Sequence, residues 1–280
     1  MINQGTMDCF RNARRQWLSL ALLICSLLAF ASNAPAQSDQ KKADNTYIEA
    51  ATVWQQASGE ARALEYQTFV LARMLLDRDL RNHRIRMRRA IIVDVDETIL
   101  DNSRYQAMLI KQGVNYPEGW TEWCNRAEAT PIPGAVEFLR YAHSRGVRVF
   151  YVTNRKIAEK DGTARNLKNV GFPEVNDETL MVRTDTKSDS KEPRRRQIAS
   201  GYHVVLLMGD NLNDFSDVFE KSKTVASRLE AAEKNRSQFG THFIVLPNPM
   251  YGDWENSIYD YNFKLSSEEK QAKRRALLKD

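Results

Sequence analysis

Two acidic side chains, Asp94 and Asp96, directly follow the short apolar run 90–93. A β-branched apolar run bounded by charge is typical of a buried strand in a parallel sheet, and ligands of such sheets bind beyond the carboxyl ends of the strands. Side chains two residues apart share a face of a strand, so the two carboxyls lie close enough to hold different protonation states. One would then act as an ionised nucleophile and the other as a protonated acid. An isolated acid pair is more often a solvated strand end, so the assignment depends on the rest of the chain.

A second apolar run, residues 147–152, also ends in polar side chains. Thr153, Asn154 and Arg155 follow it and supply a hydroxyl, an amide and a guanidinium, groups that suit the oxygens of a phosphate. Because ligands of parallel sheets sit beyond the carboxyl ends of the strands, we expect these donors on the same side of the sheet as the acid pair.

A third apolar run, residues 203–208, opens into a glycine and then into Asp210 and Asp214. Two acids four residues apart after a glycine indicate a site for a hard cation. Between the second and third runs, Lys191 stands just before a proline that suits the first turn of a helix. A lysine at that place can reach a phosphate, and Lys187 is the competing candidate.

These four loops, in the order acid pair, hydroxyl, lysine and acid pair, resemble the four motifs of the haloacid dehalogenase (HAD) superfamily of phosphotransferases. The chain resembles more narrowly the class C acid phosphatases, the group that includes the bacterial lipoprotein e(P4) 5′-nucleotidases. The resemblance covers roughly residues 50–260, and the stretches that carry it are 54–60, 95–103, 150–155, 208–215 and 247–255.

The resemblance implies an α/β fold, a three-layer α/β sandwich built on a HAD-like Rossmannoid parallel sheet, with a small cap insertion and an N-terminal helical extension. The expected segments are a signal peptide, the helical extension, the phosphatase core, the cap insertion within the core, and a charged tail. They cover residues 1–36, 37–88, 89–264, about 102–131, and 265–280.

Both ends of the expected core carry helical patterns. Residues 46–82 show apolar side chains at helical spacing, with Ser58 as a plausible N-cap and Glu60 in the first turn. The tail 265–280 is charged and lacks a strong apolar face, which is typical of a frayed helix or of disorder.

The chemistry implied by the resemblance begins with a metal ion. A phosphomonoester repels an anionic nucleophile, so the site needs counter-charge, which Mg²⁺ supplies. Magnesium prefers oxygen ligands in octahedral geometry and retains waters. The resemblance implies as its ligands the carboxylates of Asp94 and Asp210 and the backbone carbonyl of Asp96, with Asp214 as a further ligand or a group just behind them.

The reaction implied by the resemblance has two steps. Asp94 attacks phosphorus to form an aspartyl-phosphate, which splits a difficult displacement into two easier ones. Asp96 protonates the departing oxygen and then takes a proton from the hydrolytic water. Thr153 and Lys191 hold the transferred phosphoryl group, with Asn154 assisting.

The expected cap is rich in aromatic residues, and further aromatics follow the core. Aromatic rings over a phosphate site could stack a nucleobase, because stacking tolerates any base. Small subdomains also use aromatic rings for their own cores, so both interpretations stay open. We predict Tyr105, Trp123 and Tyr251 as the substrate pocket, from a set that also includes Tyr116, Trp120 and Trp254.

The N-terminus has the pattern of a secretory signal peptide, with three arginines before the apolar run 17–31 and small residues at 34–36. The apolar run is shorter than the roughly 20 residues that a bilayer core needs, which favours cleavage over an uncleaved anchor. We predict cleavage after Ala36 and an exported protein, periplasmic or secreted, with no stable membrane anchor. A lipid anchor is not expected, because the bulky Ile24 precedes Cys25 where lipoproteins have a small residue.

Removal of residues 1–36 would leave Cys124 as the one cysteine, so no internal disulfide is expected. It would also lower the net charge from +5 by the loss of three arginines and one aspartate. So mild a positive charge predicts no nucleic-acid polymer as partner. The pattern leaves open whether the protein forms a homodimer.

The sequence thus predicts an exported, Mg²⁺-dependent phosphomonoesterase, an acid phosphatase with nucleoside monophosphates as candidate substrates. Its partner would be a small phosphomonoester. One alternative is a storage or phosphate-binding protein of the same fold, which the intact nucleophile Asp94 disfavours. The other is a phosphotransferase that acts on small metabolites.

Overall fold

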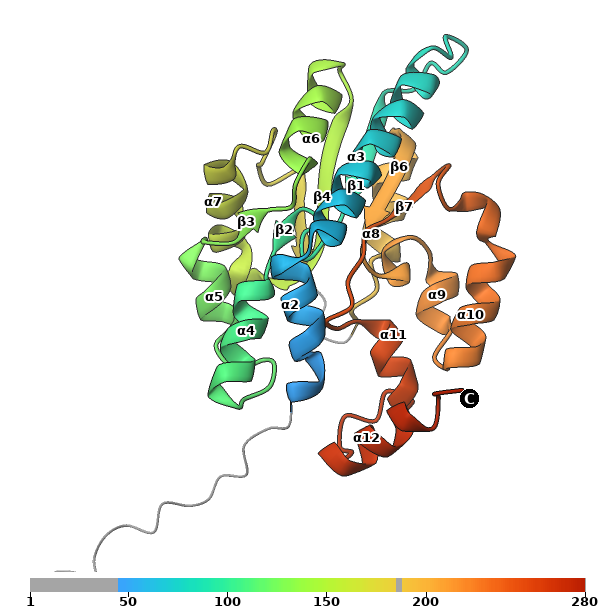
Figure 1. Ribbon diagram of the computed structural model, residues 1–280. Coiled ribbons are helices and arrows are strands. Elements are labelled where there is room, and N and C mark those ends of the chain that lie inside the picture. The colour runs from blue at the N-terminus through green and yellow to red at the C-terminus, as the bar shows by residue number, and fades with distance from the viewer. Residues whose placement is uncertain (1–44, 185–187, 280) are drawn as a thin grey trace, which may run out of the picture. The chain divides into compact units, whose positions relative to one another are not determined.

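The computed structural model describes residues 45–184 and 188–279, and the predicted signal peptide and Lys187 lie outside these residues. A parallel sheet occupies the centre, with the strand order β5-β4-β1-β6-β7 (Figure 1). Its strands are β1 (Arg89–Val93), β4 (Arg148–Lys156), β5 (Leu180–Arg183), β6 (His203–Gly209) and β7 (Phe243–Val245). The three apolar runs read from the sequence therefore form three adjacent strands at the middle of the sheet.

Alternate residues of β1 face two separate apolar clusters, and helices cover both. Ile91 and Val93 pack into the larger cluster, with residues of α3 (Gly59–Leu80), α6 (Ala135–Ser144) and α7 (Lys160–Val170). Ala90 and Ile92 pack into the smaller cluster with α8 (Glu192–Gly201), α9 (Asp217–Lys221) and α10 (Val225–Lys234). Period-two alternation on a strand buried on both faces requires this arrangement. The predicted three-layer α/β sandwich with a parallel sheet is confirmed.

The segment predicted as a cap leaves the core and returns to it at one place. The short strands β2 (Leu100–Asp101) and β3 (Thr130–Pro131) pair antiparallel, Leu100 opposite Pro131 and Asp101 opposite Thr130. Between them lie α4 (Ser103–Gln112) and α5 (Trp120–Arg126). The insertion therefore starts and ends side by side, and α5 packs against α7 of the core.

Helices precede the core as the sequence pattern predicts. They are α2 (Glu49–Ala57) and α3, and Ser58 caps α3 by accepting a hydrogen bond from the Ala61 amide. The helix α3 lies beside α6 and reaches β6 and β7 (Figure 1). It is therefore a layer of the core and not only an extension in front of it. The short helix η1 (Thr46–Ile48) leads into α2.

The chain ends in the helices α11 (Asp253–Asn256) and α12 (Ser267–Arg275). Ser266 and Glu269 form a capping box at the start of α12, so the charged tail forms a helix. The remaining 3₁₀ turns are η2 (Ile157–Glu159), η3 (Leu212–Asp214), η4 (Arg236–Gln238) and η5 (Ser257–Tyr259). Within residues 45–184 and 188–279, no helix has the length and apolar character needed to cross a bilayer.

Candidate active site

Asp94 lies where β1 ends, and neighbouring strands fix its position. Its amide donates a 2.9 Å hydrogen bond to the carbonyl of Met208 in β6. The side chain is buried, although a carboxylate at a strand end would ordinarily face solvent. A buried carboxylate needs a positively charged or hydrogen-bonding partner, and Lys191 in the loop before α8 is such a partner.

Three carboxylates gather at this edge of the sheet. One oxygen from each of Asp94, Asp210 and Asp214 lies within 4.8 Å of the others. Thr98 Oγ1 lies 3.5 Å from Asp94 Oδ2 and 3.3 Å from Asp210 Oδ1, and Asn248 Nδ2 donates to Asp210 Oδ2 at 2.8 Å. Asp94 of the first loop and both acids of the fourth loop therefore form one cluster.

The loop after β6 turns Asp214 back towards the strand ends. Asn211 is the N-cap of the 3₁₀ turn η3, and its backbone amide donates to Asp214 Oδ2 at 3.1 Å. Asp214 then packs against Gly209, where a Cβ atom would overlap the carboxylate. Glycine is required at this position because of the close approach, which explains the glycine that precedes the two acids.

Lys191 is the cation of the cluster. It stands at the N-cap of α8, and its Nζ forms ion pairs with Asp94 and, at 2.7 Å, with Asp214. Its side chain is only 8% exposed, so water competes little for the ammonium. Of the two candidate lysines, Lys191 is the one that the described residues include.

The charges in this site do not balance. Burial raises the pKa of Asp94, and the neighbouring Asp214 raises it further against the opposing effect of Lys191. Burial also raises the pKa of Asp210 well above its ordinary value, with Asp214 and Asp94 adding to it. Burial alone would lower the pKa of Lys191, but the two carboxylates outweigh it and raise that pKa. Among the described residues, one ammonium thus faces three carboxylates.

The donor set fits a hard divalent cation. Carboxylate oxygens that converge within 4.8 Å, with excess negative charge, are the ligands that Mg²⁺ prefers. Burial first, and then the neighbouring carboxylates, raise the pKa of Asp94 and of Asp210, and both effects disfavour the charged form that a bound cation would stabilise. A divalent cation held by Asp94 and Asp210, with Asp214 beside them, would supply the counter-charge.

Asp96 has a different environment from Asp94. Arg155 Nε and Nη2 donate to Asp96 Oδ1 at 3.0 and 2.8 Å, and Asn102 Nδ2 donates to the same oxygen at 2.9 Å. Arg155 is 2% exposed. The expectation that its guanidinium serves phosphate oxygens therefore differs from the structure, where it is held by Asp96.

Thr153 and Asn154 point to different neighbours at the end of β4. The Thr153 side chain is buried, and its Oγ1 lies 3.4 Å from Asp96 Oδ2. Asn154 is exposed, donates to the carbonyl of Asp189 and accepts from Arg194 Nη2. Thr153 thus adjoins the acidic cluster, whereas Asn154 links the β4 end to the loop before α8.

The predicted aromatic pocket does not form as one surface. Tyr105 is fully buried and donates to the carbonyl of Glu118, and Trp123 is 4% exposed and donates to Asn102 Oδ1. In this conformation both rings belong to the core of the cap, because α4 and α5 pack them against each other and against Trp120. Tyr251 is partly exposed.

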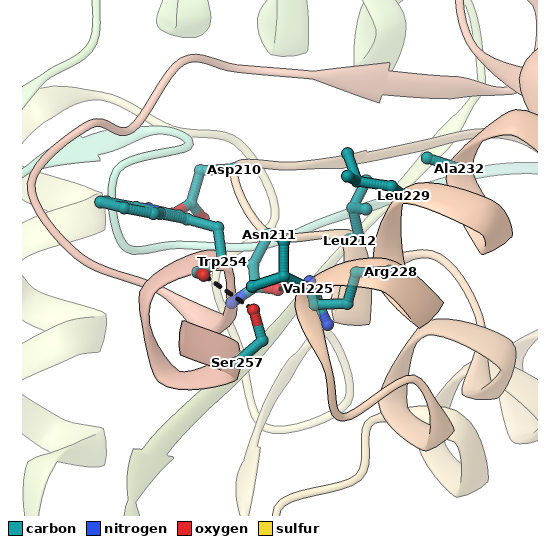
Figure 2. A pocket seen from close by; sticks show the side chains of 9 residues that line it. All are labelled: Asp210, Asn211, Leu212, Val225, Arg228, Leu229, Ala232, Trp254 and Ser257. Atoms are coloured by element: carbon teal, nitrogen blue, oxygen red, sulfur yellow. Dashed lines mark hydrogen bonds between the residues drawn. The ribbon is translucent and has the colours of Figure 1, made fainter. Parts of the chain in front are cut away.

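A cavity of about 190 Å³ adjoins Asp210. Figure 2 shows the ring of Trp254 on one side of it and Leu229 and Ala232 of α10 on the other. Trp254 is 45% exposed, so its ring is accessible from this cavity. The aromatic residue that lines this cavity is therefore one that sequence reasoning left outside its selected three.

Sequence reasoning missed three polar residues that surround the carboxylates: Thr98, Asn102 and Asn248. Thr98 stands four residues after Asp94 within the same motif, and Asn102 follows closely. Asn248 lies in the stretch 247–255 that carries the family resemblance. Their position within the motifs was a signal that these residues lie near the site. The sequence does not show which carboxylate each one contacts, because that depends on how the loops fold.

The comparisons with known proteins agree with this geometry. The family model described as HAD superfamily, subfamily IIIB (Acid phosphatase), matches residues 15–254. The crystal structure of class C acid phosphatase from Bacillus anthracis with tungstate bound is 42% identical, with a TM-score of 0.81, and the match covers 84% of this chain and 98% of that one. A second structure of the same Bacillus anthracis enzyme gives 42% identity over the same shares and a TM-score of 0.80.

A more distant relative is a plant protein. The stem 31 kDa glycoprotein of Glycine max is 24% identical over 169 residues, which are 57% of this chain and 58% of the soybean protein. The match therefore spans little more than half of that relative's length. With the family model covering most of the chain, the protein belongs to subfamily IIIB, the acid phosphatases, of the HAD superfamily.

Proposed function

We propose that the protein is a Mg²⁺-dependent phosphomonoesterase that works through an aspartyl-phosphate on Asp94. The observation that carries the proposal is the bridge of Lys191 between Asp94 and Asp214, with Asp210 completing the acidic cluster. The Lys191 ammonium lies beside the nucleophile Asp94, and the acidic cluster would bind a metal ion. Both positive charges suit a dianionic phosphate, whose charge must be offset before a carboxylate can approach phosphorus.

The proposed reaction assigns a part to each residue of the site. Asp94 attacks phosphorus in line and the ester oxygen departs, with a proton from Asp96. Water then attacks the aspartyl-phosphate and gives a proton to Asp96 while the bond from phosphorus to Asp94 breaks, which releases phosphate and restores the Asp94 carboxylate and the protonated Asp96. Lys191 and Thr153 hold the phosphoryl oxygens, and Asn154 supports the loop. Mg²⁺ would be held by Asp94, Asp210 and the Asp96 carbonyl, with Asp214 as a further ligand or just behind them, and would supply positive charge that offsets the phosphate.

Two observations support a phosphate-shaped ligand at this site. Tungstate, which the Bacillus anthracis relative binds, is a tetrahedral oxyanion like phosphate. In this chain, Lys191 Nζ contacts Asp94 and Thr153 Oγ1 lies near Asp96, so each aspartate of the first motif has one of these groups beside it. We extend that relative's anion site to this chain on the strength of the shared motifs.

Nucleoside monophosphates are the proposed substrate class. Stacking of a base on an aromatic ring contributes about 1 to 3 kcal/mol and does not depend on which base is present. Tyr251 is partly exposed, and its amide lies 3.4 Å from the Oδ1 of Asn248, which itself binds Asp210. Asn248 therefore links the backbone of Tyr251 to Asp210 of the acidic cluster. Tyr116 is 59% exposed on the cap.

The proposed location is outside the cytoplasm, in the periplasm or secreted, with residues 1–36 acting as a cleaved signal peptide. The pattern of arginines, apolar run and small residues in the sequence supports it. N-terminal sequencing of the mature protein, with Gln37 as the expected first residue, tests the cleavage site.

A hydrolysis panel tests the activity. Nucleoside monophosphates, sugar phosphates, glycerol phosphate and 4-nitrophenyl phosphate are compared with the unsubstituted protein and with Asp94→Asn. We expect hydrolysis by the first protein alone, and a labelled aspartyl-phosphate on acid quenching that Asp94→Asn does not form. Binding of phosphate without turnover of any ester would instead establish the storage or binding alternative.

A further inference from the structure

The two carboxylate oxygens of Asp96 are held unequally. Oδ1 accepts three hydrogen bonds of 2.8 to 3.0 Å, two from Arg155 and one from Asn102. Within residues 45–184 and 188–279, Oδ2 has only longer contacts, at 3.3 Å to Arg155 Nε and 3.4 Å to Thr153 Oγ1. A carboxylate oxygen offers about two lone-pair positions, so Oδ1 is saturated and Oδ2 has capacity left for a proton.

Arg155 is itself held in place. Its Nη1 donates to Thr163 Oγ1 of α7 at 3.0 Å, and its Nη2 reaches Asn102 Oδ1 at 3.3 Å. Its backbone amide donates to Thr153 Oγ1 at 3.1 Å, and the guanidinium lies 5.3 Å from the ring centre of Trp120. A buried planar group with contacts on all its sides has one orientation, so it presents a rigid fork to Asp96.

Asn102 connects the same carboxylate to the cap. Trp123 Nε1 donates to Asn102 Oδ1 at 2.8 Å, which leaves the Asn102 amino group to face Asp96. The Asn102 backbone amide donates to Glu97 Oε1 at 2.8 Å. Trp123 belongs to α5, so a cap residue sets the direction of an amide that binds the carboxylate two residues after the nucleophile.

We propose that Arg155 is a positioning residue that, with Asn102 and Trp123, holds Asp96 so that its Oδ2 exchanges the proton of the reaction. The inference rests on the proposed function. As the phosphorus–oxygen bond of the ester breaks, the proton on Oδ2 moves to the departing oxygen. In the second step, a water oxygen bonds to phosphorus, the bond from phosphorus to Asp94 breaks, and Oδ2 takes the water proton. Arg155 neither gives nor takes a proton.

The test uses the dependence of the rate on the leaving group. Alkoxides leave only with a proton, whereas 4-nitrophenolate leaves without one, so a misplaced acid harms the first class selectively. For Arg155→Met we expect kcat on glycerol phosphate to fall on the order of 100-fold, and kcat on 4-nitrophenyl phosphate less than about tenfold. The inhibition constant of inorganic phosphate should stay unchanged, since Arg155 does not contact the phosphoryl group in this proposal.

A double-mutant cycle separates positioning from a general structural role. In an Asp96→Asn background, Arg155→Met should lower kcat on glycerol phosphate no further, because the group that it positions is already gone. Arg228→Met is the matched control. Arg228 is also buried, at 6% exposure, and bonds to Asn213 Oδ1 and the Phe219 carbonyl, without contact to Asp96. Its losses should be equal across leaving groups and should add to those of Asp96→Asn.

Trp123→Phe provides a second variant, which keeps an aromatic side chain in the cap and removes the N–H that orients Asn102. It should show the same leaving-group selectivity in smaller degree, even if Arg155→Met does not fold. Equal losses on both ester classes, a loss confined to KM, or additivity with Asp96→Asn would overturn the positioning role and leave the phosphatase assignment intact. An unsubstituted protein that hydrolyses no phosphomonoester would overturn both.

Discussion

Lys191 donates a 2.7 Å hydrogen bond to Asp214, and both side chains are only 8% exposed. The same ammonium pairs with Asp94, so a residue from the start of α8 joins the ends of β1 and β6. A single buried cation thus organises two of the three carboxylates, and its removal would leave them facing each other.

The first prediction concerns this lysine. Lys191→Met should lower kcat on the order of 10²- to 10³-fold, the usual effect of removing one preorganised donor from developing negative charge. Steady-state kinetics on 4-nitrophenyl phosphate measures it. Lys221→Met is the control, because Lys221 lies exposed on α9 and pairs with Asp217. Similar activities of the two variants would mean that Lys191 has no part in the reaction.

The second prediction concerns the metal. A chelator should abolish activity and Mg²⁺ restore it, because the carboxylate cluster lacks counter-charge. Mg²⁺ should also raise the melting temperature, by an amount that corresponds to about 2.7 kcal/mol at 100 times its Kd. Asp210→Asn should remove this shift, whereas Asp217→Asn, on the exposed face of α9, should keep it. Full activity in excess chelator would exclude the metal assignment.

The third prediction concerns base recognition. Tyr251→Ala should raise KM for nucleotides about tenfold for each 1.4 kcal/mol of stacking lost, and leave turnover of glycerol phosphate nearly unchanged. Trp123→Ala serves as the comparison, because Trp123 is buried. Loss of this ring should lower the melting temperature and should not raise KM for nucleotides more than KM for glycerol phosphate. If Tyr251→Ala weakened both substrates equally, Tyr251 would not be a stacking platform.

The fourth prediction concerns acid stability at the end of α3. Burial opposes the ionised form of Asp79, but hydrogen bonds with Arg89 and His203 outweigh it and lower its pKa. A lowered carboxyl pKa stabilises the fold above the pKa of the unfolded chain, and this stability is lost as pH falls through the folded-state value. Asp79→Asn should therefore lower the melting temperature at pH 7, and the difference should shrink below about pH 4.

Thermal unfolding across pH measures this effect. Asp177→Asn is the matched control, because Asp177 also has a lowered pKa from an ion pair, with Lys160, but is fully exposed. Its substitution should change the melting temperature little at any pH. A constant difference between Asp79→Asn and the unsubstituted protein down to pH 3 would refute the linkage.

The sequence allowed prediction of the parallel sheet and of the acidic cluster for a physical reason. Apolar runs that end in polar groups describe both a buried strand and the edge at which its carboxyl end meets others. Asp94 and Asp210 lie 116 positions apart in the chain, and adjacent parallel strands bring them together. The apolar runs that became β1 and β6 were therefore sufficient to predict that Asp94 and Asp210 lie at the same edge of the sheet.

The polar shell of Asp96 was not predictable in the same way. Arg155 could serve a phosphate or a carboxylate, and only the orientation of its long side chain decides between them. Tyr105 and Trp123 could stack on a ligand or fill a small core, and composition does not distinguish these outcomes. Their burial depends on how α4 and α5 pack, which no local pattern encodes.

The pairing of Leu100 with Pro131 makes the cap an insertion that leaves the core and returns to it at the same place. Because its two ends are neighbours in an antiparallel pair, a longer or shorter insertion changes the closure entropy by only about 0.6 kcal/mol per doubling of length. Descendants of this protein can therefore replace much of residues 104–129 and reach new substrates while the five-stranded platform stays as it is. The contact of Trp123 with Asn102 is the tether that such exchanges would have to preserve.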